Sequence, residues 1–133
     1  MEIKARVICR GYAEGEALVS KESISFYGGV DPNTGKVVEK GHPIEGISVK
    51  GKVLIFPRGK GSTVGSYTIY RLKKNGNAPC AIINTECDPI VAVGAIISGI
   101  PLVDKPKKDV MRIIKNGQWV KVDAVNGIIK IKG

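Results

Sequence analysis

The residues best suited to chemistry lie in a glycine-punctuated loop, Pro57–Thr63, directly after an apolar run at 51–56. The run is typical of a strand buried on both faces. A helix is expected after the loop, with Ser62 as its N-cap. The N–H groups at a helix start favour an anion, and Arg58 and Lys60 add full positive charge beside them.

Ser62 could also act as a base, because several N–H groups and one or two cations would stabilise its alkoxide. The spacing fits neither a P-loop, since Lys60 precedes Gly61-Ser62-Thr63, nor a dinucleotide-binding fingerprint. A hydrolytic triad is not expected, because His42 is the single histidine. A plain N-cap and a catalytic base are therefore the two alternatives for Ser62.

A second loop follows the same plan after the next buried strand, expected at 80–84. Asp88 is placed as the N-cap of a small-residue helix at 90–98, and a third buried strand is expected at 100–103. Strand–helix–strand–helix–strand order predicts parallel strands, whose carboxyl ends meet at one edge. Thr85, Glu86 and Asp88 would then either close a site with the first loop or merely cap the helix.

The chain ends add β elements around this central unit. Apolar alternation predicts strands at both ends of the chain: 3–9, 15–20, 24–27, 118–124 and 128–132. The last two are joined by an Asn-Gly turn that indicates a hairpin. With no long linker and no internal repeat, we expect a single α/β domain over residues 1–133.

The composition supports a folded, strand-rich chain. Of 133 residues, 43% are apolar and 25% charged, which excludes a disordered chain. The 18 Ile and 15 Val outnumber the 4 Leu, a bias toward β-branched side chains that favours strands. The longest uncharged run, 89–103, is shorter than the roughly 20 residues of a membrane span, and no signal segment opens the chain. We expect a cytoplasmic protein.

Neither a resident metal nor a nucleic-acid partner is expected. The three cysteines, Cys9, Cys80 and Cys87, form no C-x-x-C pair and offer too few soft ligands for a zinc ion or an iron–sulfur cluster. The net charge of +9 raises the question of nucleic acid, but the 7 aromatic residues do not interleave with the basic ones. The 16 Lys and 5 Arg also suit a solvated surface or an anionic small substrate better.

Three stretches together resemble the small swivelling domain of the aconitase superfamily, most closely the short archaeal aconitase X subunits. They are residues 57–67, 75–79 and 83–97, and the resemblance runs nearly from end to end. It implies a β/β/α swivelling domain that docks on a separate large subunit as a heterodimer or higher assembly. The large subunit would hold a 4Fe–4S cluster through three of its own cysteines, and this chain would hold no cluster.

The resemblance also implies a hydro-lyase reaction, the dehydration of (R)-5-phosphomevalonate to trans-anhydromevalonate 5-phosphate in an archaeal mevalonate route to isoprenoids. Ser62 corresponds to the serine that accepts the proton from carbon. Arg58, Lys60, Gly61 and Thr63 would contact the substrate.

The sequence departs from ordinary aconitases after the serine. Those enzymes continue with Ser-Arg, and the arginine binds a substrate carboxylate, whereas Thr63-Val64 stands here. Anion binding would shift to Arg58, to Lys60 or to the large subunit. The alternative function is a freestanding swivelling binding module with no activity of its own.

Overall fold

The computed structural model describes residues 1–132; Gly133, part of the expected domain 1–133, lies outside them. Its elements, in chain order, are β1 Glu2–Lys4, β2 Arg6–Cys9, β3 Tyr12–Val19, α1 Phe26–Gly29, β4 Val53–Phe56, α2 Gly65–Lys74, β5 Ala81–Asn84, α3 Pro89–Ser98, β6 Leu102–Asp104, α4 Val110–Ile113, β7 Trp119–Asp123 and β8 Ile128–Ile131. No helix among these residues has both the length and the apolar character needed to cross a membrane.

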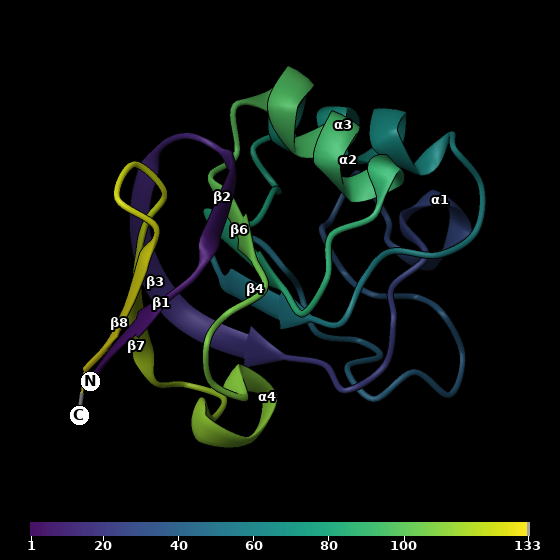
Figure 1. Cartoon of the computed structure of the whole chain (residues 1–133). Coiled ribbons are helices and arrows are strands. Elements are labelled where there is room, and N and C mark those ends of the chain that lie inside the picture. Colours follow the sequence, from purple (N-terminus) through teal and green to yellow (C-terminus); the bar gives the residue numbers. More distant parts are fainter. Residues whose placement is uncertain (133) are drawn as a thin grey trace.

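The strands follow one hydrogen-bonded order, β1-β8-β7-β3-β4-β5-β6-β2. β3, β4, β5 and β6 are parallel to one another, and β2 closes their far edge in the antiparallel sense. β7, β8 and β1 continue antiparallel from the other side of β3. The long, curved β3 therefore belongs to both halves, as Figure 1 shows. The expected parallel unit, flanked by β elements from both chain ends, is confirmed.

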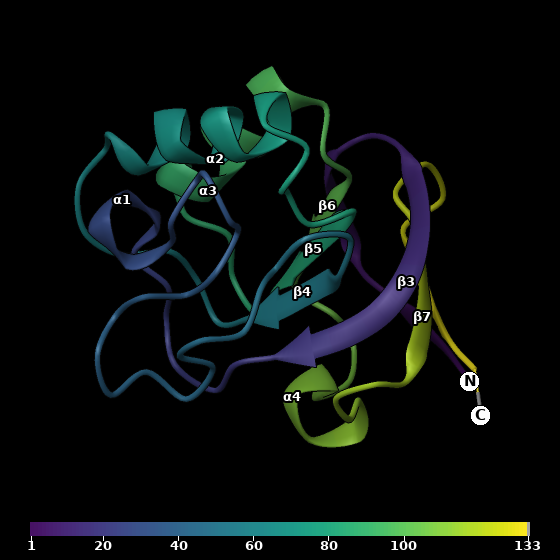
Figure 2. The ribbon, with the colours of Figure 1, turned by 180° about the vertical axis from the view of Figure 1, so that it is seen from behind.

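Two apolar cores lie on the two faces of the parallel strands. On one face, Leu54, Phe56 and Ile82 pack against residues of α2 and α3, including Leu72 and Val91. On the other face, alternate residues of the same strands pack against α4 and the β1-β8-β7 half. The view from behind shows α2 and α3 together on one side of the strands and α4 on the opposite side (Figure 2). The result is the β/β/α layering that the resemblance implies.

The elements with the strongest local signals lie where the sequence predicts them. β4, β5 and β6 are fully buried, as expected of uninterrupted apolar runs between helices. Asp88 caps α3, and Gly99 ends it in a left-handed conformation. Asn75 caps the carboxyl end of α2. The Trp119–Asp123 and Ile128–Ile131 strands form the expected hairpin.

Two of the predicted strands are wrong. The strand expected at 3–9 is broken at Ala5, whose N–H donates to Gly127 O over 2.9 Å, so its halves pair with different strands, β8 and β6. The segment 24–27 makes a single bridge, Ile24 to Gly59, and then turns into the irregular α1. Gly28, at a φ of +82°, allows this turn. The expected strand at 15–20 is β3, which begins earlier, at Tyr12.

The common direction of the parallel strands determines where the candidate site lies. Because β4, β5 and β6 run in one direction, the loops after them emerge at one edge of the sheet, where ligands bind in open α/β sheets. These loops span 57–64, 85–88 and 105–109.

Candidate active site

Ser62 lies exposed in the loop between β4 and α2. Its hydroxyl accepts the N–H of Val64 at 3.1 Å, and its carbonyl accepts the N–H of Gly65 at 2.9 Å. α2 begins only at Gly65, with Val64 at the N-cap position. The predicted N-cap role of Ser62 is therefore wrong, because an extra turn over 62–65 separates the serine from the helix. The hydroxyl caps this turn and is otherwise open to the outside.

The two glycines of the loop are required by close packing. The buried Gly59 donates its N–H to Asp88 Oδ1 at 2.7 Å, and a Cβ there would come within 2.7 Å of a methyl of Val91. Gly61 has a φ of +89°, and a Cβ on it would approach Ser25 Oγ to 2.6 Å. The backbone beside Ser62 is thus fixed in a conformation that other residues would strain.

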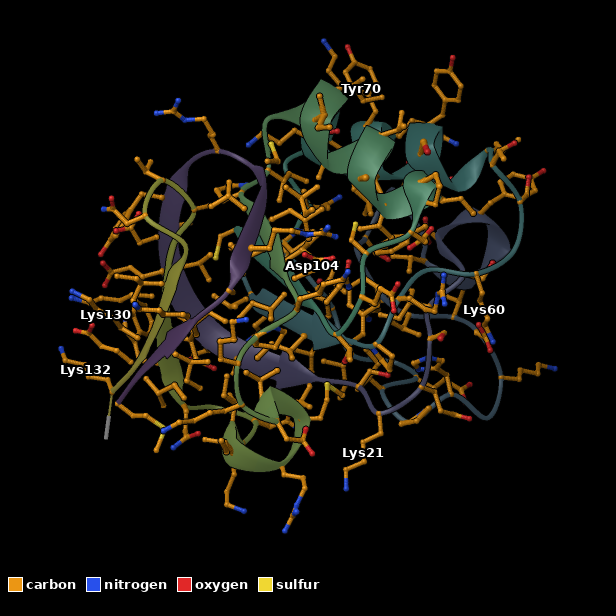
Figure 3. All side chains as sticks on the ribbon, viewed as in Figure 1. Lys21, Lys60, Tyr70, Asp104, Lys130 and Lys132 are labelled. Atoms are coloured by element: carbon orange, nitrogen blue, oxygen red, sulfur yellow. The ribbon has the colours of Figure 1, made fainter. Side chains whose placement is uncertain are left out.

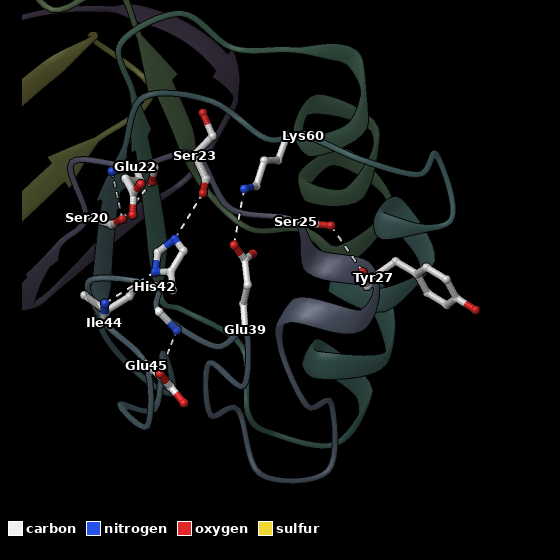
Figure 4. Close-up of polar contacts among 11 residues, drawn as sticks. Ser20, Glu22, Ser23, Ser25, Tyr27, Glu39, His42, Ile44, Glu45 and Lys60 are labelled. Carbon is white, nitrogen blue, oxygen red and sulfur yellow. Dashed lines mark hydrogen bonds and ion pairs between the residues drawn. The ribbon is translucent and has the colours of Figure 1, made fainter.

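The segment 23–25 holds the loop from its other side. Ile24 N–H donates to Arg58 O at 3.3 Å, and Lys60 N–H donates to Ile24 O at 3.1 Å. The ammonium of Lys60 pairs with Glu39 at 3.3 Å, while the side chain of Arg58 is exposed. Figure 4 shows this ion pair near the contacts of Ser23 with His42 and of Ser25 with Tyr27. Both predicted cations therefore belong to a backbone that is held in place.

His42 contacts the 23–25 segment that holds the loop. It is buried, its Nε2 lies 3.0 Å from Ser23 O, and its Nδ1 accepts the N–H of Ile44 at 3.3 Å (Figure 4). Since Nδ1 is an acceptor, Nε2 carries the hydrogen and donates to Ser23. The sequence gives no signal for the contact with the 23–25 segment, because Ser23 lies 19 positions from His42 along the chain.

The second loop lies beside the first. The N–H groups of Thr85 and Glu86 both donate to Pro57 O, at 3.1 and 3.2 Å, and both side chains are exposed. Asp88 is buried and accepts from Gly59 with one oxygen and from Ile90 with the other, at 2.9 Å. Asp88 thus fills the predicted N-cap position and also joins the two loops.

An ion pair between the half-exposed Arg6 and the buried Asp104, which the sequence does not reveal, anchors the second loop. Asp104 is fully buried and receives two 2.8 Å bonds from the guanidinium of Arg6, and its Oδ2 also accepts the N–H of Cys87 at 2.8 Å. Burial alone would raise the pKa of Asp104, but these donors lower it below its ordinary value. Arg6 and Asp104 lie 98 positions apart, so no local pattern connects them. Lys105 follows with an unusual φ of +48° and donates its N–H to Thr85 O.

The cysteines do not fit an iron–sulfur cluster. Burial, reinforced by Asp88 and Asp104, raises the pKa of Cys87 to about 12, and burial also raises the pKa values of Cys9 and Cys80. Metals bind the thiolate, which these environments disfavour. Over residues 1–132 no three His, Cys, Asp or Glu side chains gather as a metal site.

The sequence matches the family described as Aconitase X swivel domain over residues 2–131. The chain belongs to this family. A protein of Methanocella arvoryzae named phosphomevalonate dehydratase small subunit is 62% identical over 131 residues, covering 98% of this chain and 99% of that protein. A protein of Thermococcus onnurineus with the same name is 57% identical over 132 residues and covers 99% of each chain.

A solved structure supports both the fold and the family. The crystal structure of Thermococcus kodakaraensis aconitase X, in its holo-form, superposes with a TM-score of 0.95 at 54% identity, covering 100% of this chain and 99% of that one. The aconitase X resemblance and the β/β/α fold are therefore confirmed. Within this family fold, the glycine-bounded loop presents an exposed hydroxyl that accepts one N–H, and the same loop carries the exposed Arg58 and the Lys60 that pairs with Glu39.

Proposed function

We propose that this chain is the small subunit of a two-subunit hydro-lyase that dehydrates (R)-5-phosphomevalonate to trans-anhydromevalonate 5-phosphate, in the mevalonate route to isoprenoids. The names of its full-length relatives support this assignment. The observation that carries the mechanism is the exposed Ser62 on a backbone held by Asp88 and Ile24. Because the substrate carries a phosphate and does not cross membranes unaided, we place the reaction in the cytoplasm.

Ser62 acts as the proton acceptor in this proposal. Its alkoxide takes a proton from the carbon next to the one that bears the leaving hydroxyl group. The electron pair of that C–H bond becomes the new double bond, and the hydroxyl group leaves as hydroxide with its own bonding pair. This hydroxide and the proton that Ser62 then releases make the water lost in the reaction, and the alkoxide is restored. The Val64 N–H stabilises the alkoxide, and the charges of Arg58 and Lys60 favour its formation.

The substrate is an anion, and the loop is suited to receive it. Lys60 is held by Glu39 in an exposed ion pair, which is worth little energy in water, so a phosphate or carboxylate competes for the ammonium. We propose that Arg58, Lys60, Gly61 and Thr63 contact the substrate. Thr85 and Glu86 extend from the neighbouring loop, which the shared Pro57 carbonyl holds at this edge.

The remaining half of the site belongs to a large subunit in this proposal. The thiols of this chain do not fit a cluster, so we assign the 4Fe–4S cluster that the family resemblance implies to that subunit. We further propose that residues 1–133 act as one swivelling domain docked on it, in a heterodimer or a larger assembly.

The test reconstitutes the chain with the large subunit from the same organism and follows dehydration of 5-phosphomevalonate by mass spectrometry. The isolated chain is expected to be colourless and inactive. Ser62→Ala is expected to lower kcat of the complex by roughly 10²–10⁴-fold, the usual contribution of a proton-transfer residue. Turnover above about a tenth of the parent value would leave Ser62 as a turn residue only.

The chain offers a matched control. Ser48 accepts the N–H of Lys50 at 3.2 Å, two residues on, as Ser62 accepts that of Val64, but its hydroxyl also donates to Thr34 O, outside the site loops. Ser48→Ala removes an equivalent turn contact and is expected to leave kcat unchanged. A comparable loss in both variants would show that the effect is one of local structure.

A further inference from the structure

The outer face of α3 is apolar although it is exposed. The helix, Pro89–Ser98, contains no charged residue, and Val93, Ile96 and Ile97 on its outer side are 49%, 57% and 46% exposed. A surface helix normally turns a polar face to water, and a helix that is apolar all round is normally covered. This face has the composition of a buried surface.

α2 extends the same surface. Val64, Tyr67 and Tyr70 are exposed large side chains at its start and along it, and Tyr67 is 66% exposed. Tyr70 projects outward from the helical layer in Figure 3. We refer to six residues as the α2–α3 face: Val64, Tyr67, Tyr70, Val93, Ile96 and Ile97.

A groove between the two helices lies within this surface. It has a volume of about 430 Å³ and is lined by both helix starts, Thr63 and Val64 on one side and Pro89 and Ile90 on the other. The two helices pack closely against each other, because a Cβ on Gly94 of α3 would come within 2.6 Å of Ile69 of α2. The helices are therefore held together, and the groove is a preformed feature of the surface.

The charges around the face favour a foreign partner over a second copy. α2 carries Arg71, Lys73 and Lys74 in its last turn, neither helix contains an acidic residue, and the chain has a net charge of +9. Two copies meeting through the same face would bring these cations together, which like-charge repulsion disfavours. An apolar surface bordered by carboxylates complements the face.

The face is continuous with the candidate site. Thr63 and Val64 line the groove and directly follow Ser62, and Pro89 follows Asp88, which holds the site loop. A subunit that completes the site around Ser62 must approach this edge, where the groove opens.

We propose that the α2–α3 face is the docking surface for the large subunit, which covers it with an apolar ridge bordered by acidic side chains. This inference rests on the proposed function, from which it takes the identity of the partner.

The test measures the dissociation constant of the complex by titrating the chain into the large subunit. Ile97→Asp places a charge in the face without touching Ser62, so it is expected to weaken association by about a hundredfold. Since Ile97 takes no part in catalysis, kcat is expected to recover at saturating small subunit. The control is Val38→Asp, a valine of similar exposure, 48%, outside the face, which is expected to bind as the parent does.

The outcomes separate the two proposals. If the parent pair binds and turns over but Ile97→Asp, still folded by circular dichroism, binds as tightly as Val38→Asp, the docking surface is wrong and the function stands. If binding depends on Ile97 but the pair does not dehydrate 5-phosphomevalonate, the function is wrong and the surface stands. Self-association of the isolated chain that Ile97→Asp abolishes would overturn the proposal in favour of a second copy.

Discussion

Asp88 holds the two site loops together, and its removal tests whether the loop beside Ser62 is held as the structure indicates. The residue is 6% exposed, and its carboxylate accepts N–H groups from Gly59, Ile90 and Val91 at 2.7, 2.9 and 3.4 Å. Asp88→Ala removes an N-cap, at a cost of about 0.5–2 kcal/mol. It also leaves the buried Gly59 N–H without an acceptor, at about 1–3 kcal/mol. If the two contributions add, the free energy of unfolding is expected to fall by about 1.5–5 kcal/mol.

Two further variants resolve these contributions. Asp88→Asn keeps one acceptor oxygen but sets an NH₂ group against either the helix start or Gly59, so we expect about half the loss of the alanine variant. The control is Asp109→Ala, because Asp109 occupies the N-cap position of α4 without any side-chain bond to the helix. Its loss is expected to be within about 0.5 kcal/mol, as for other surface changes.

The measurement is urea unfolding followed by circular dichroism, with the slope against denaturant checked for each variant. If Asp88→Ala costs no more than Asp109→Ala, the bond to Gly59 has no energetic weight and the loop is not held by it. If the predicted loss is found, the Asp88→Asn complex is also expected to show a lower kcat with little change in KM, because the loop backbone next to Ser62 would shift.

Two other predictions follow from the charges. Arg58→Ala or Lys60→Ala is expected to raise KM about tenfold for each lost contact with a substrate anion, taking ~1.5 kcal/mol per charged hydrogen bond. Glu39→Gln is expected to lower KM, because it frees the Lys60 ammonium for the substrate. An unchanged KM in all three variants would assign anion binding to the large subunit. Because the folded-state pKa of Asp104 is lowered, its pairing with Arg6 stabilises the chain fully above about pH 5, and the contribution disappears as pH falls through that folded-state pKa. The difference in unfolding free energy between the parent and Asp104→Asn should therefore shrink on acidification; a constant difference from pH 7 to pH 3 would contradict the ion-pair account.

Local sequence signals predict the parallel centre of this fold because each signal there has a local cause. Buried runs such as 53–56 need no partner to be recognised as strands, and the Asp88-Pro89 start and Gly99 end of α3 act within one turn. The break at Ala5 has no such cause. The alternation continues across it, and only the pairing of one half with β8 and the other with β6 interrupts the strand.

The candidate site also combines features that have a local cause in the sequence with contacts that have none. The loops, their cations and the N-cap Asp88 can be recognised from spacing, since chain direction brings the ends of parallel strands to one edge. The contacts that position these residues cannot be recognised from spacing. The Asp88–Gly59 bond spans 29 residues, the His42–Ser23 bond 19 and the Arg6–Asp104 pair 98. Each of these contacts involves a residue type that occurs in many other roles.

The error at Ser62 has a mechanistic consequence. A serine at the N-cap of α2 would have its oxygen bonded to an N–H group of the first turn of that helix. Here the turn over 62–65 moves the serine ahead of α2, and one N–H, from Val64, contacts the hydroxyl. In the proposed mechanism that single donor stabilises the alkoxide, and the serine is otherwise exposed. The turn over 62–65 therefore places the exposed serine ahead of α2, next to Thr63 and Val64 of the groove on the surface that we propose for docking.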